Sequence, residues 1–408
     1  MTIPIDRQLE ILAARSVNLV SLPELRRKLE GAAQGQRPLR VKYGADPSAP
    51  DIHLGHVVGL NKLREFQDLG HTVVFIIGDF TALIGDPSGR SETRPRLAPE
   101  QIAANAKTYQ DQVFKVLDPQ RTEVRFNTEW CAGLALAEVL RLAAQVTVAQ
   151  MLARDDFQKR FQEQEPISLV EFLYPVIQGY DSVQVAADVE VGGTDQLFNL
   201  LVGRDLQKAS GQDQQVVLTL PLLEGLDGVR KMSKSLGNYV GISESPREMF
   251  GKIMSIPDTL IGRYFSLVLG WSADKVRALE QDLAAGRKHP RRVKDELAQA
   301  IVEKFHSPAA ARNASAEFAR MFAEHQPPDD IPTVTIPMTQ RKNGKLGIVA
   351  LLVAAGLAES NSAARRLVQQ GAVRVGADAV TDITAELVIP EGCLIQAGKR
   401  AFARINSA

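Results

Sequence analysis

The sequence has few cysteines, no long apolar run and no net charge. Two cysteines, Cys131 and Cys393, occur among 408 residues, without a CxxC pair. Their scarcity excludes a disulfide framework and a zinc-finger-like site, and it favours a reducing, cytoplasmic setting. No run approaches the eighteen apolar residues of a membrane span, and residues 1–17 lack the pattern of a secretion signal. Lys and Arg total 48, as do Asp and Glu, so a polyanionic partner has to be recognised by a local patch.

The first half of the chain alternates β-branched runs with helical patterns such as 56–70 and 99–117. The expected strands are 39–44, 73–79, 122–127, 184–193 and 215–222. This alternation predicts an α/β fold with a Rossmann-type parallel sheet, which we place at residues 1–240. Ligands of such sheets bind at the carboxyl ends of the strands. The loops DIHLGH (51–56), GDPSGR (85–90) and GGTDQ (192–196) follow strands and are therefore the expected functional loops.

The second half has a different pattern. Residues 241–325 are helical by periodicity, beginning with a capping sequence SPRE at 245–248, and 326–340 have the composition of a linker. Residues 341–408 predict a small α+β module with nine Lys or Arg against five acidic residues. A basic end on an uncharged chain suits either a polyanion-binding appendage or a small solvated domain.

Two histidines, His53 and His56, stand where a strand and loop lead into a helix. A zinc site is disfavoured because the spacing is three, Leu54 and Gly55 intervene, and no third His or Cys ligand is near. A helix start offers free N–H groups, so an anion site is possible, and Gly55 would let a flat group approach the backbone. A purely structural helix start remains the alternative.

The segment KMSKS at 231–235 carries Lys231 and Lys234 among small residues. Such a run can be an ordinary solvated surface. At the end of a nucleotide-binding domain it could instead close over a triphosphate, where its lysines would stabilise the charge of a departing pyrophosphate. The sequence has no GxxxxGK[ST] motif, so it is not a P-loop enzyme.

HLGH at 53–56 followed by KMSKS at 231–235 resembles the paired signature of class I aminoacyl-tRNA synthetases. The segments YGADPSAPDIHLGH, LIGDPSGR, EFLYPVIQGYDS and VGGTDQ resemble the tyrosyl-tRNA synthetases in particular. The basic tail is similar to the RNA-binding module named after ribosomal small-subunit protein four. Together these similarities cover nearly the whole chain.

The resemblance implies a role for each matching residue. Contacts to the ATP phosphates and pyrophosphate would come from His53, His56, Lys231, Lys234, Arg90 and Arg94. The ribose and adenylate would be held at Asp46, Gly55, Gly193 and Asp195, and by Lys234. The amino acid would be bound by Asp86, Tyr174, Gln178, Asp181 and Gln196. Arg365 and Arg366 are candidates for contacts to the tRNA backbone.

Independent support comes from Tyr174, Gln178 and Asp181, which are spaced i, i+4, i+7 and so share one face of a helix. This stripe suits an aromatic ligand with polar groups at both ends, although a solvent-facing polar stripe would look the same. By the resemblance, Asp181 would accept the phenolic hydroxyl of the substrate. Phenylalanine would leave this carboxylate unpaired and would therefore be disfavoured. Lys42 departs from the family, many members of which have a tyrosine there that binds the substrate hydroxyl. Whether the Lys42 ammonium replaces that contact is left open.

The expected reaction has two steps. Tyrosine attacks the α-phosphorus of ATP, which enters with magnesium, and the resulting tyrosyl-adenylate then esterifies the terminal ribose of its tRNA. The resemblance implies a homodimer, with tRNA bound by residues 241–325 and by the tail, no membrane, and no tightly held metal. A tryptophanyl-tRNA synthetase and a retired synthetase kept as an RNA-binding protein remain the alternatives.

Overall fold

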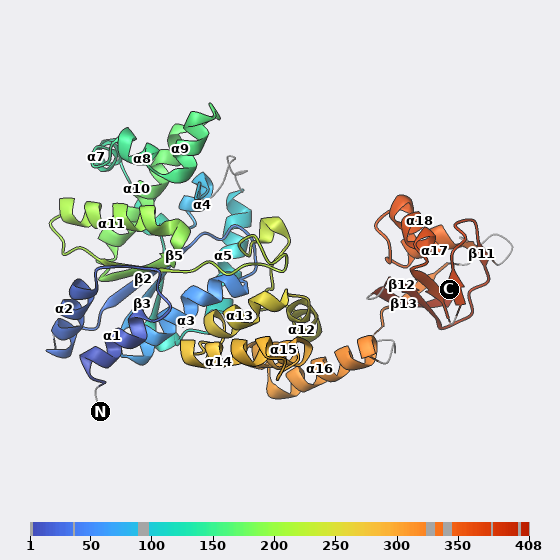
Figure 1. Ribbon diagram of the computed structural model, residues 1–408. Coiled ribbons are helices and arrows are strands. Elements are labelled where there is room, and N and C mark those ends of the chain that lie inside the picture. The colour runs from blue at the N-terminus through green and yellow to red at the C-terminus, as the bar shows by residue number, and fades with distance from the viewer. Residues whose placement is uncertain are drawn as a thin grey trace. The chain divides into compact units, whose positions relative to one another are not determined.

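The computed structural model describes residues 3–35, 37–88, 98–323, 331–337, 345–376, 378–398 and 401–407. The chain divides into two compact units, Met1–Arg312 and Asn313–Ala408 (Figure 1). No helix in these ranges is long and apolar enough to span a membrane.

A six-stranded sheet with the order β1-β6-β5-β2-β3-β4 forms the centre of the first unit. Its strands are β1 (Asn18–Val20), β2 (Arg40–Ala45), β3 (Thr72–Ile77), β4 (Thr122–Phe126), β5 (Val189–Gly193) and β6 (Val216–Leu220). β1 is antiparallel to β6, whereas all other neighbours are parallel. All of β6 and nearly all of β3 are buried, which is why both strands appear in the sequence as continuous apolar runs.

The parallel sheet that the sequence predicts is confirmed, with two differences at the level of single elements. The predicted strand 184–193 begins only at Val189, because helix α10 (Leu169–Gln184) continues to Gln184. The edge strand β1 was not predicted, since its three residues are too few to show an alternating pattern.

Helices make up most of the rest of the first unit, and the last of them continues past Arg312 into the second unit. Before α10 the chain forms α1 (Ile5–Ala13), α2 (Leu22–Ala33), α3 (Leu54–Asp68), α4 (Thr81–Ile84), α5 (Pro99–Val113), α6 (Thr128–Cys131), α7 (Leu136–Ala143), α8 (Val148–Leu152) and α9 (Asp155–Gln162). After it come α11 (Leu197–Ala209), α12 (Pro246–Met254), α13 (Ile261–Leu267), α14 (Ala273–Ala284), α15 (Pro290–Phe305) and α16 (Pro308–Ala323). The side chain of Ser245 caps α12 as predicted, by accepting from the backbone N–H of Glu248. Gly70, which follows α3, has the positive φ of +94° that favours glycine at such a stop.

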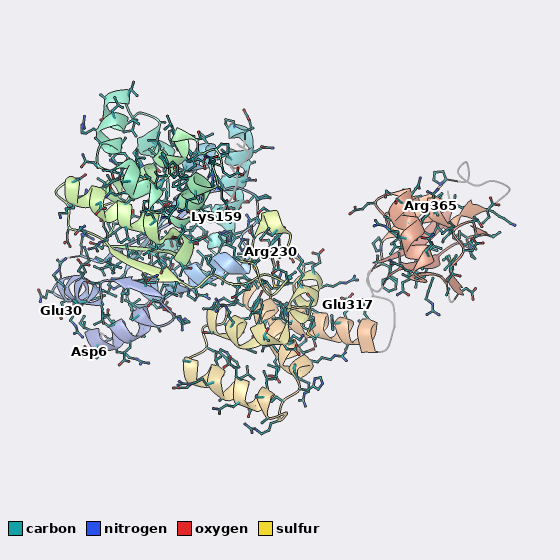
Figure 2. All side chains as sticks on the ribbon, turned by 45° about the horizontal axis from the view of Figure 1, so that its top comes forward. Asp6, Glu30, Lys159, Arg230, Glu317 and Arg365 are labelled. Carbon is teal, nitrogen blue, oxygen red and sulfur yellow. The ribbon has the colours of Figure 1, made fainter. Side chains whose placement is uncertain are left out.

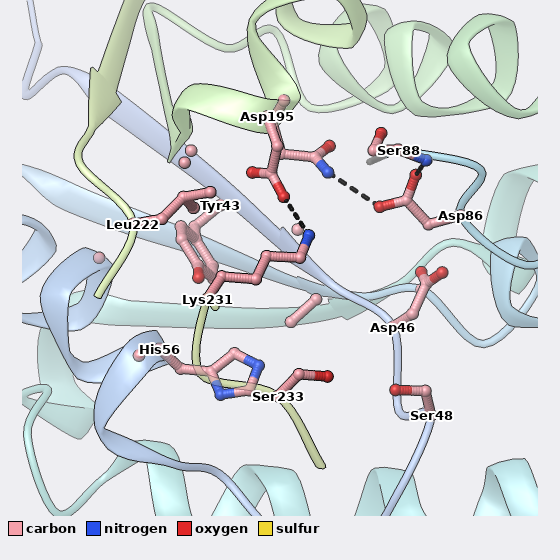
Figure 3. A pocket seen from close by; sticks show the side chains of 18 of the residues that line it. Tyr43, Asp46, Ser48, His56, Asp86, Ser88, Asp195, Leu222, Lys231 and Ser233 are labelled. Atoms are coloured by element: carbon pink, nitrogen blue, oxygen red, sulfur yellow. Dashed lines mark hydrogen bonds and ion pairs between the residues drawn. The ribbon is translucent and has the colours of Figure 1, made fainter. Parts of the chain in front are cut away.

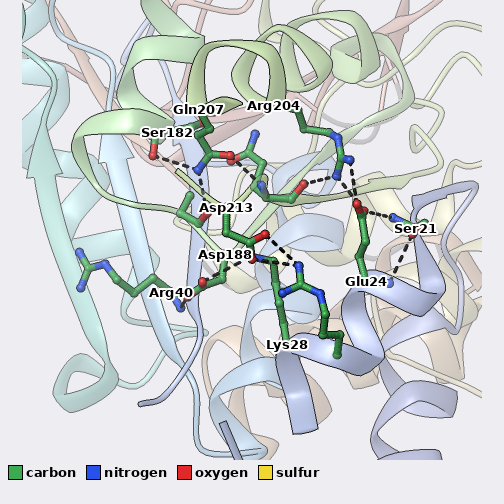
Figure 4. A network of polar contacts seen from close by, with 12 residues as sticks. Ser21, Glu24, Lys28, Arg40, Ser182, Asp188, Arg204, Gln207 and Asp213 are labelled. Atoms are coloured by element: carbon green, nitrogen blue, oxygen red, sulfur yellow. Dashed lines mark hydrogen bonds and ion pairs between the residues drawn. The ribbon is translucent and has the colours of Figure 1, made fainter. Parts of the chain in front are cut away.

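A polar network ties α2 to the amino ends of the parallel strands (Figure 4). Lys28 Nζ lies 2.7 Å from Asp213 Oδ2 and 3.7 Å from Asp188 Oδ1, and Asp188 directly precedes β5. Arg204 of α11 pairs with Glu24 of α2 at 2.9 Å. Each of these charged groups has a partner of opposite sign, so the network stabilises this end of the sheet, whereas ligands of a parallel sheet bind at the carboxyl ends of its strands.

The second unit contains a five-stranded sheet in the order β10-β9-β12-β13-β7 and a two-stranded pair. Its elements are β7 (Thr333–Ile336), β8 (Leu346–Gly347), α17 (Ile348–Ala354), α18 (Asn361–Gln369), β9 (Val373–Val375), β10 (Asp378–Val380), β11 (Glu386–Leu387), β12 (Cys393–Ala397) and β13 (Ala401–Ser407). Both predicted tail helices are present, followed by Gly356 and Gly371 at positive φ. Part of the expected linker forms a strand instead, because β7 pairs in parallel with β13.

Candidate active site

A cavity of about 640 Å³ opens at the carboxyl ends of the parallel strands of the first unit (Figure 3). Thirteen of the residues singled out from the sequence line it: Asp46, His53, Gly55, His56, Asp86, Tyr174, Gln178, Asp181, Gly193, Asp195, Gln196, Lys231 and Lys234. Lys42 does not line the cavity. Arg90 and Arg94 lie outside the described residues. Arg365 and Arg366 are exposed on α18 of the second unit, where Arg365 is marked in Figure 2.

The imidazoles of His53 and His56 form the start of α3. His53 is the N-cap and its Nδ1 accepts from the Gly55 backbone N–H at 3.2 Å, while His56 Nδ1 accepts from the His53 N–H at the same distance. Their ring centroids are 3.9 Å apart. Gly55 is needed for this arrangement, because a Cβ there would lie 2.9 Å from the His53 ring. A nitrogen that accepts a hydrogen bond carries no proton, so both neutral rings have their N–H at Nε2.

Charge and burial keep these imidazoles neutral. Burial lowers the pKa of His56 to about 3, with the Lys234 ammonium adding to the shift. The pKa of His53 is also well below its usual value, first through burial and then through His56 and Lys234. Both side chains are therefore uncharged hydrogen-bond donors at neutral pH, the form that can bind phosphate oxygens without carrying a buried charge.

Backbone pairing brings the KMSKS segment to this helix start. Leu54 N–H donates to Val240 O at 2.9 Å, and Ile242 N–H donates to Ile52 O at 2.9 Å. Met232 of the segment lies so close to Gly55 that a Cβ on that glycine would be 3.6 Å from Met232 Cβ. Residues separated by almost 180 positions in the chain therefore enclose one cavity, as the paired-motif hypothesis requires.

Both lysines of the segment are held at the cavity wall. Lys231 Nζ lies 2.7 Å from Asp195 Oδ2 (Figure 3). Lys234 Nζ donates to Ala49 O at 3.1 Å and to the Tyr109 hydroxyl at 2.9 Å. These contacts hold both ammonium groups at the wall of the cavity that the imidazole pair also lines.

Carboxylates and amides line the other half of the cavity. Asp86 accepts from Gln196 Nε2 at 2.8 Å and from the Ser88 N–H at 2.8 Å. Tyr174 donates its hydroxyl to Asp46 Oδ2 at 2.9 Å. The result is an acidic, hydrogen-bonding wall that suits an ammonium group.

The Asn199 side chain arranges the two glutamine amides of this wall. Its Nδ2 donates to Gln178 Oε1 at 3.0 Å and to Gln196 Oε1 at 3.1 Å, and its Oδ1 accepts from Arg154 at 3.1 Å. Asn199 was not singled out from the sequence. Its spacing of three from Gln196 at the start of α11 is the signal that could have indicated it.

Asp181 is buried at the inner end of the cavity. Trp130 Nε1 donates to its Oδ1 at 2.8 Å, and Asn127 Nδ2 approaches its Oδ2 at 3.4 Å. Burial raises the pKa of Asp181 to about 7, although Lys42 and these two donors oppose the shift. Neither donor was predicted. Asn127 directly follows β4, so the rule that functional loops follow strands could have found it, whereas nothing in the sequence indicated Trp130.

Lys42 lies behind this wall. Its side chain is fully buried, and Nζ contacts the Gln178 carbonyl at 2.8 Å, Ser182 Oγ at 2.7 Å and Glu190 Oε1 at 2.8 Å. The direct contact to a substrate hydroxyl that was left open from the sequence is not supported by this position. Lys42 instead acts on Asp181 through its charge.

The fold and the cavity together define the catalytic domain of a class I aminoacyl-tRNA synthetase. A parallel sheet carries one cavity, which is lined by the imidazole pair and by the lysines of the KMSKS segment. The family model of class I tRNA synthetases (W and Y) matches residues 34–323, and that of the C-terminal domain of tyrosine–tRNA ligases matches residues 326–402. The chain belongs to the tyrosine–tRNA ligase family.

Relatives and solved structures agree with this assignment. The tyrosine–tRNA ligase of Moorella thermoacetica is 54% identical over 403 residues, covering 99% of this chain and 96% of the relative. That of Thiobacillus denitrificans is 56% identical over 370 residues, or 91% and 92% of the two chains. The fold is shared with a tyrosyl-tRNA synthetase from Archaeoglobus fulgidus solved with L-tyrosine, at a TM-score of 0.62 and 23% identity, covering 76% of this chain and 100% of that one.

Proposed function

We propose that this protein activates L-tyrosine with ATP and transfers it to the 3′-terminal adenosine of its tRNA. The observation that carries the proposal is that His53, His56, Lys231 and Lys234 line the same cavity as the polar stripe of α10 and Asp86. One half of this cavity suits phosphates and the other an aromatic amino acid with polar groups at both ends.

In the first step, the carboxylate of tyrosine attacks the α-phosphorus of ATP and pyrophosphate leaves. The two neutral imidazoles donate Nε2–H to phosphate oxygens, and Lys231 and Lys234 balance the charge that grows on the pyrophosphate. Arg90 and Arg94 are proposed to assist them. In the second step, the ribose hydroxyl of the tRNA attacks the activated carbonyl and AMP leaves. No side chain forms a covalent bond, so positioning and charge account for the catalysis.

Each end of the amino acid has a proposed partner. Asp86, Tyr174 and Gln178 would bind the ammonium group, and Gln196 would face the carboxylate. Asp181 would accept the phenolic hydroxyl. The nucleotide would lie on Gly55 and Gly193, with its ribose on Asp195 and with Asp46 at the boundary between the two substrates.

ATP is proposed to enter as its magnesium complex, with the metal held by phosphate oxygens. Among the described residues, no group of three or more His, Cys, Asp or Glu is placed to hold a metal ion. The side chains at the phosphate end are imidazoles and ammonium groups, which bind phosphate oxygens rather than magnesium.

The decisive experiment is pyrophosphate exchange measured with each of the twenty amino acids separately. Exchange that depends on tyrosine, with phenylalanine and tryptophan far slower, supports the proposal and rejects the tryptophan enzyme. Absence of exchange with every amino acid would favour the non-catalytic alternative.

The basic tail and the helical region 241–325 are proposed to bind tRNA, with Arg365 and Arg366 contacting its backbone. Both arginines are exposed on α18, whose opposite face buries Ala364 and Val368. Replacing both arginines by alanine should weaken tRNA charging, most strongly at low salt, where phosphate contacts contribute most to binding, and leave pyrophosphate exchange unchanged. Arg7→Ala, on an exposed helix of the first unit, is the matched control.

A homodimer is also proposed, on the evidence of exposed apolar side chains on α7, α8, α9 and α10. These four helices lie near one another in Figure 1. Five large residues there are between 61% and 82% exposed: Leu136, Leu140, Val148, Phe161 and Leu169. Exposed apolar side chains of this size suit an interface with a second copy. Leu140→Asp should shift the protein to a monomer in analytical ultracentrifugation, while an unchanged mass would reject this face. Given its substrates, we place the protein in the cytoplasm.

A further inference from the structure

Tyr43 lines the nucleotide side of the cavity but has no role in the assignments above. It belongs to β2 and stacks on Phe75 of β3, with ring centroids 5.8 Å apart. Figure 3 shows its ring in the cavity close to Leu222 and Lys231. An aromatic side chain therefore forms part of the surface against which a nucleotide would lie.

The position of the Tyr43 ring depends on a glycine in α3. A Cβ at Gly59 would lie 2.6 Å from Tyr43 Cε2 and 3.2 Å from its hydroxyl oxygen. Glycine within a helix costs about 1 kcal/mol relative to alanine, so a glycine in the middle of α3 needs a reason. The Tyr43 ring, which fills the space of the missing side chain, supplies that reason.

The Tyr43 hydroxyl is available to a ligand. No described residue forms a hydrogen bond with it, and the residue is only partly buried. Burial raises the pKa of Tyr43 to about 12, and the Asp195 carboxylate adds to the shift. The phenol is therefore protonated and can donate at neutral pH. Tyr43 and Asp195 line the same cavity.

We propose that Tyr43 is a specificity-determining residue that donates its hydroxyl to a ribose hydroxyl of ATP, and that Gly59 is the partner that makes room for its ring. The inference rests on the proposed function, because it places the ribose at Asp195. It goes further in assigning ribose recognition to a second side chain and in explaining the glycine of α3.

The test compares ATP with 2′-deoxyATP and 3′-deoxyATP in tyrosine-dependent pyrophosphate exchange. Tyr43→Phe keeps the ring and removes only the hydroxyl. One neutral hydrogen bond corresponds to about a 2- to 10-fold change, so the KM for ATP should rise by that factor. The preference for ATP over one of the two analogues should shrink by the same factor, and the KM for tyrosine should not change.

Gly59→Ala tests the second half of the inference. The added methyl displaces the ring, so the KM for ATP should rise at least as much as in Tyr43→Phe. The double variant Tyr43→Leu with Gly59→Ala should regain thermal stability but not the preference for ATP. Gly251→Ala is the matched control, because this helical glycine has open space around it. It should leave every kinetic constant unchanged.

The outcomes separate this inference from the proposed function. If the wild type shows no tyrosine-dependent exchange, the proposed function fails. If the wild type is active and Tyr43→Phe keeps both its KM for ATP and its preference over both deoxy analogues, only the role of Tyr43 is overturned. Equal losses with ATP and both analogues would also overturn it.

Discussion

The buried ion pair between Lys42 and Glu190 makes the sharpest prediction, because it couples stability to substrate binding. The two side chains are 0% and 1% exposed, and their charged atoms are 2.8 Å apart. Lys42→Met keeps the apolar stem but leaves the Glu190 carboxylate without its cation. Breaking a fully buried pair in this way costs about 3–5 kcal/mol in the free energy of unfolding.

The double variant Lys42→Met with Glu190→Gln removes both charges and should recover most of that loss. The exposed pair of Arg7 and Glu10, at 66% and 65% exposure, is the control, since Arg7→Met should cost less than about 1 kcal/mol. Urea denaturation gives these differences. A loss for Lys42→Met as small as that of the control would contradict the buried-charge argument.

The same substitution should change tyrosine binding. The Lys42 charge opposes the effect of burial on the pKa of Asp181, so its removal raises that pKa above about 7. Less Asp181 is then ionised at pH 7, and the kcat/KM for tyrosine should fall there and recover at higher pH. The KM for ATP should not change. A variant that loses stability while its pH profile for tyrosine stays in place would show that Lys42 has a structural role alone.

Three further predictions concern single ionisable groups. Asp181→Asn should remove the rise of kcat/KM for tyrosine through pH 7 and weaken tyrosine binding about 10- to 100-fold, as expected for a lost charged hydrogen bond; a profile that still rises would reject the assignment. His56→Ala should slow adenylate formation about 10²- to 10³-fold in single-turnover assays without unfolding the protein. Burial lowers the pKa of His71 to about 4, whereas the unfolded chain titrates near 6.5. Below pH 6.5 the unfolded state therefore binds more protons than the folded state, and the protein loses stability. The stability lost between pH 7 and pH 5 should therefore be smaller by roughly 2 kcal/mol in His71→Gln, as urea midpoints would show.

Local patterns in the sequence predicted the parallel sheet and the polar stripe of α10, whereas most other cavity residues were predicted through the resemblance to tyrosyl-tRNA synthetases. β3 and β6 are continuous apolar runs, and Asp46 and Asp195 lie just after β2 and β5, whereas the short helix α4 separates Asp86 from β3. The stripe of α10 follows from helical spacing. These signals lie within a few residues of each other, so no knowledge of tertiary contacts is needed to find them.

The parts that the sequence did not predict depend on contacts between distant segments. Trp130 supports Asp181 across 51 positions, and Lys42 reaches Glu190 from another strand. Such roles depend on packing, which spacing along the chain does not record.

The ion pair of Lys231 in the KMSKS segment is weak enough for the phosphates of ATP to replace it. Lys231 pairs with Asp195 while both side chains keep access to solvent, at 36% and 20% exposure. A pair of this kind stabilises a protein by about 0–1 kcal/mol, so the phosphates of ATP can capture the ammonium at little cost. In the proposed mode of binding the ribose takes Asp195 as its partner, so the carboxylate that holds the lysine would become a binding group for the substrate. The KMSKS segment and the ribose site would then be linked through one side chain, and nucleotide binding would release Lys231 for the departing pyrophosphate.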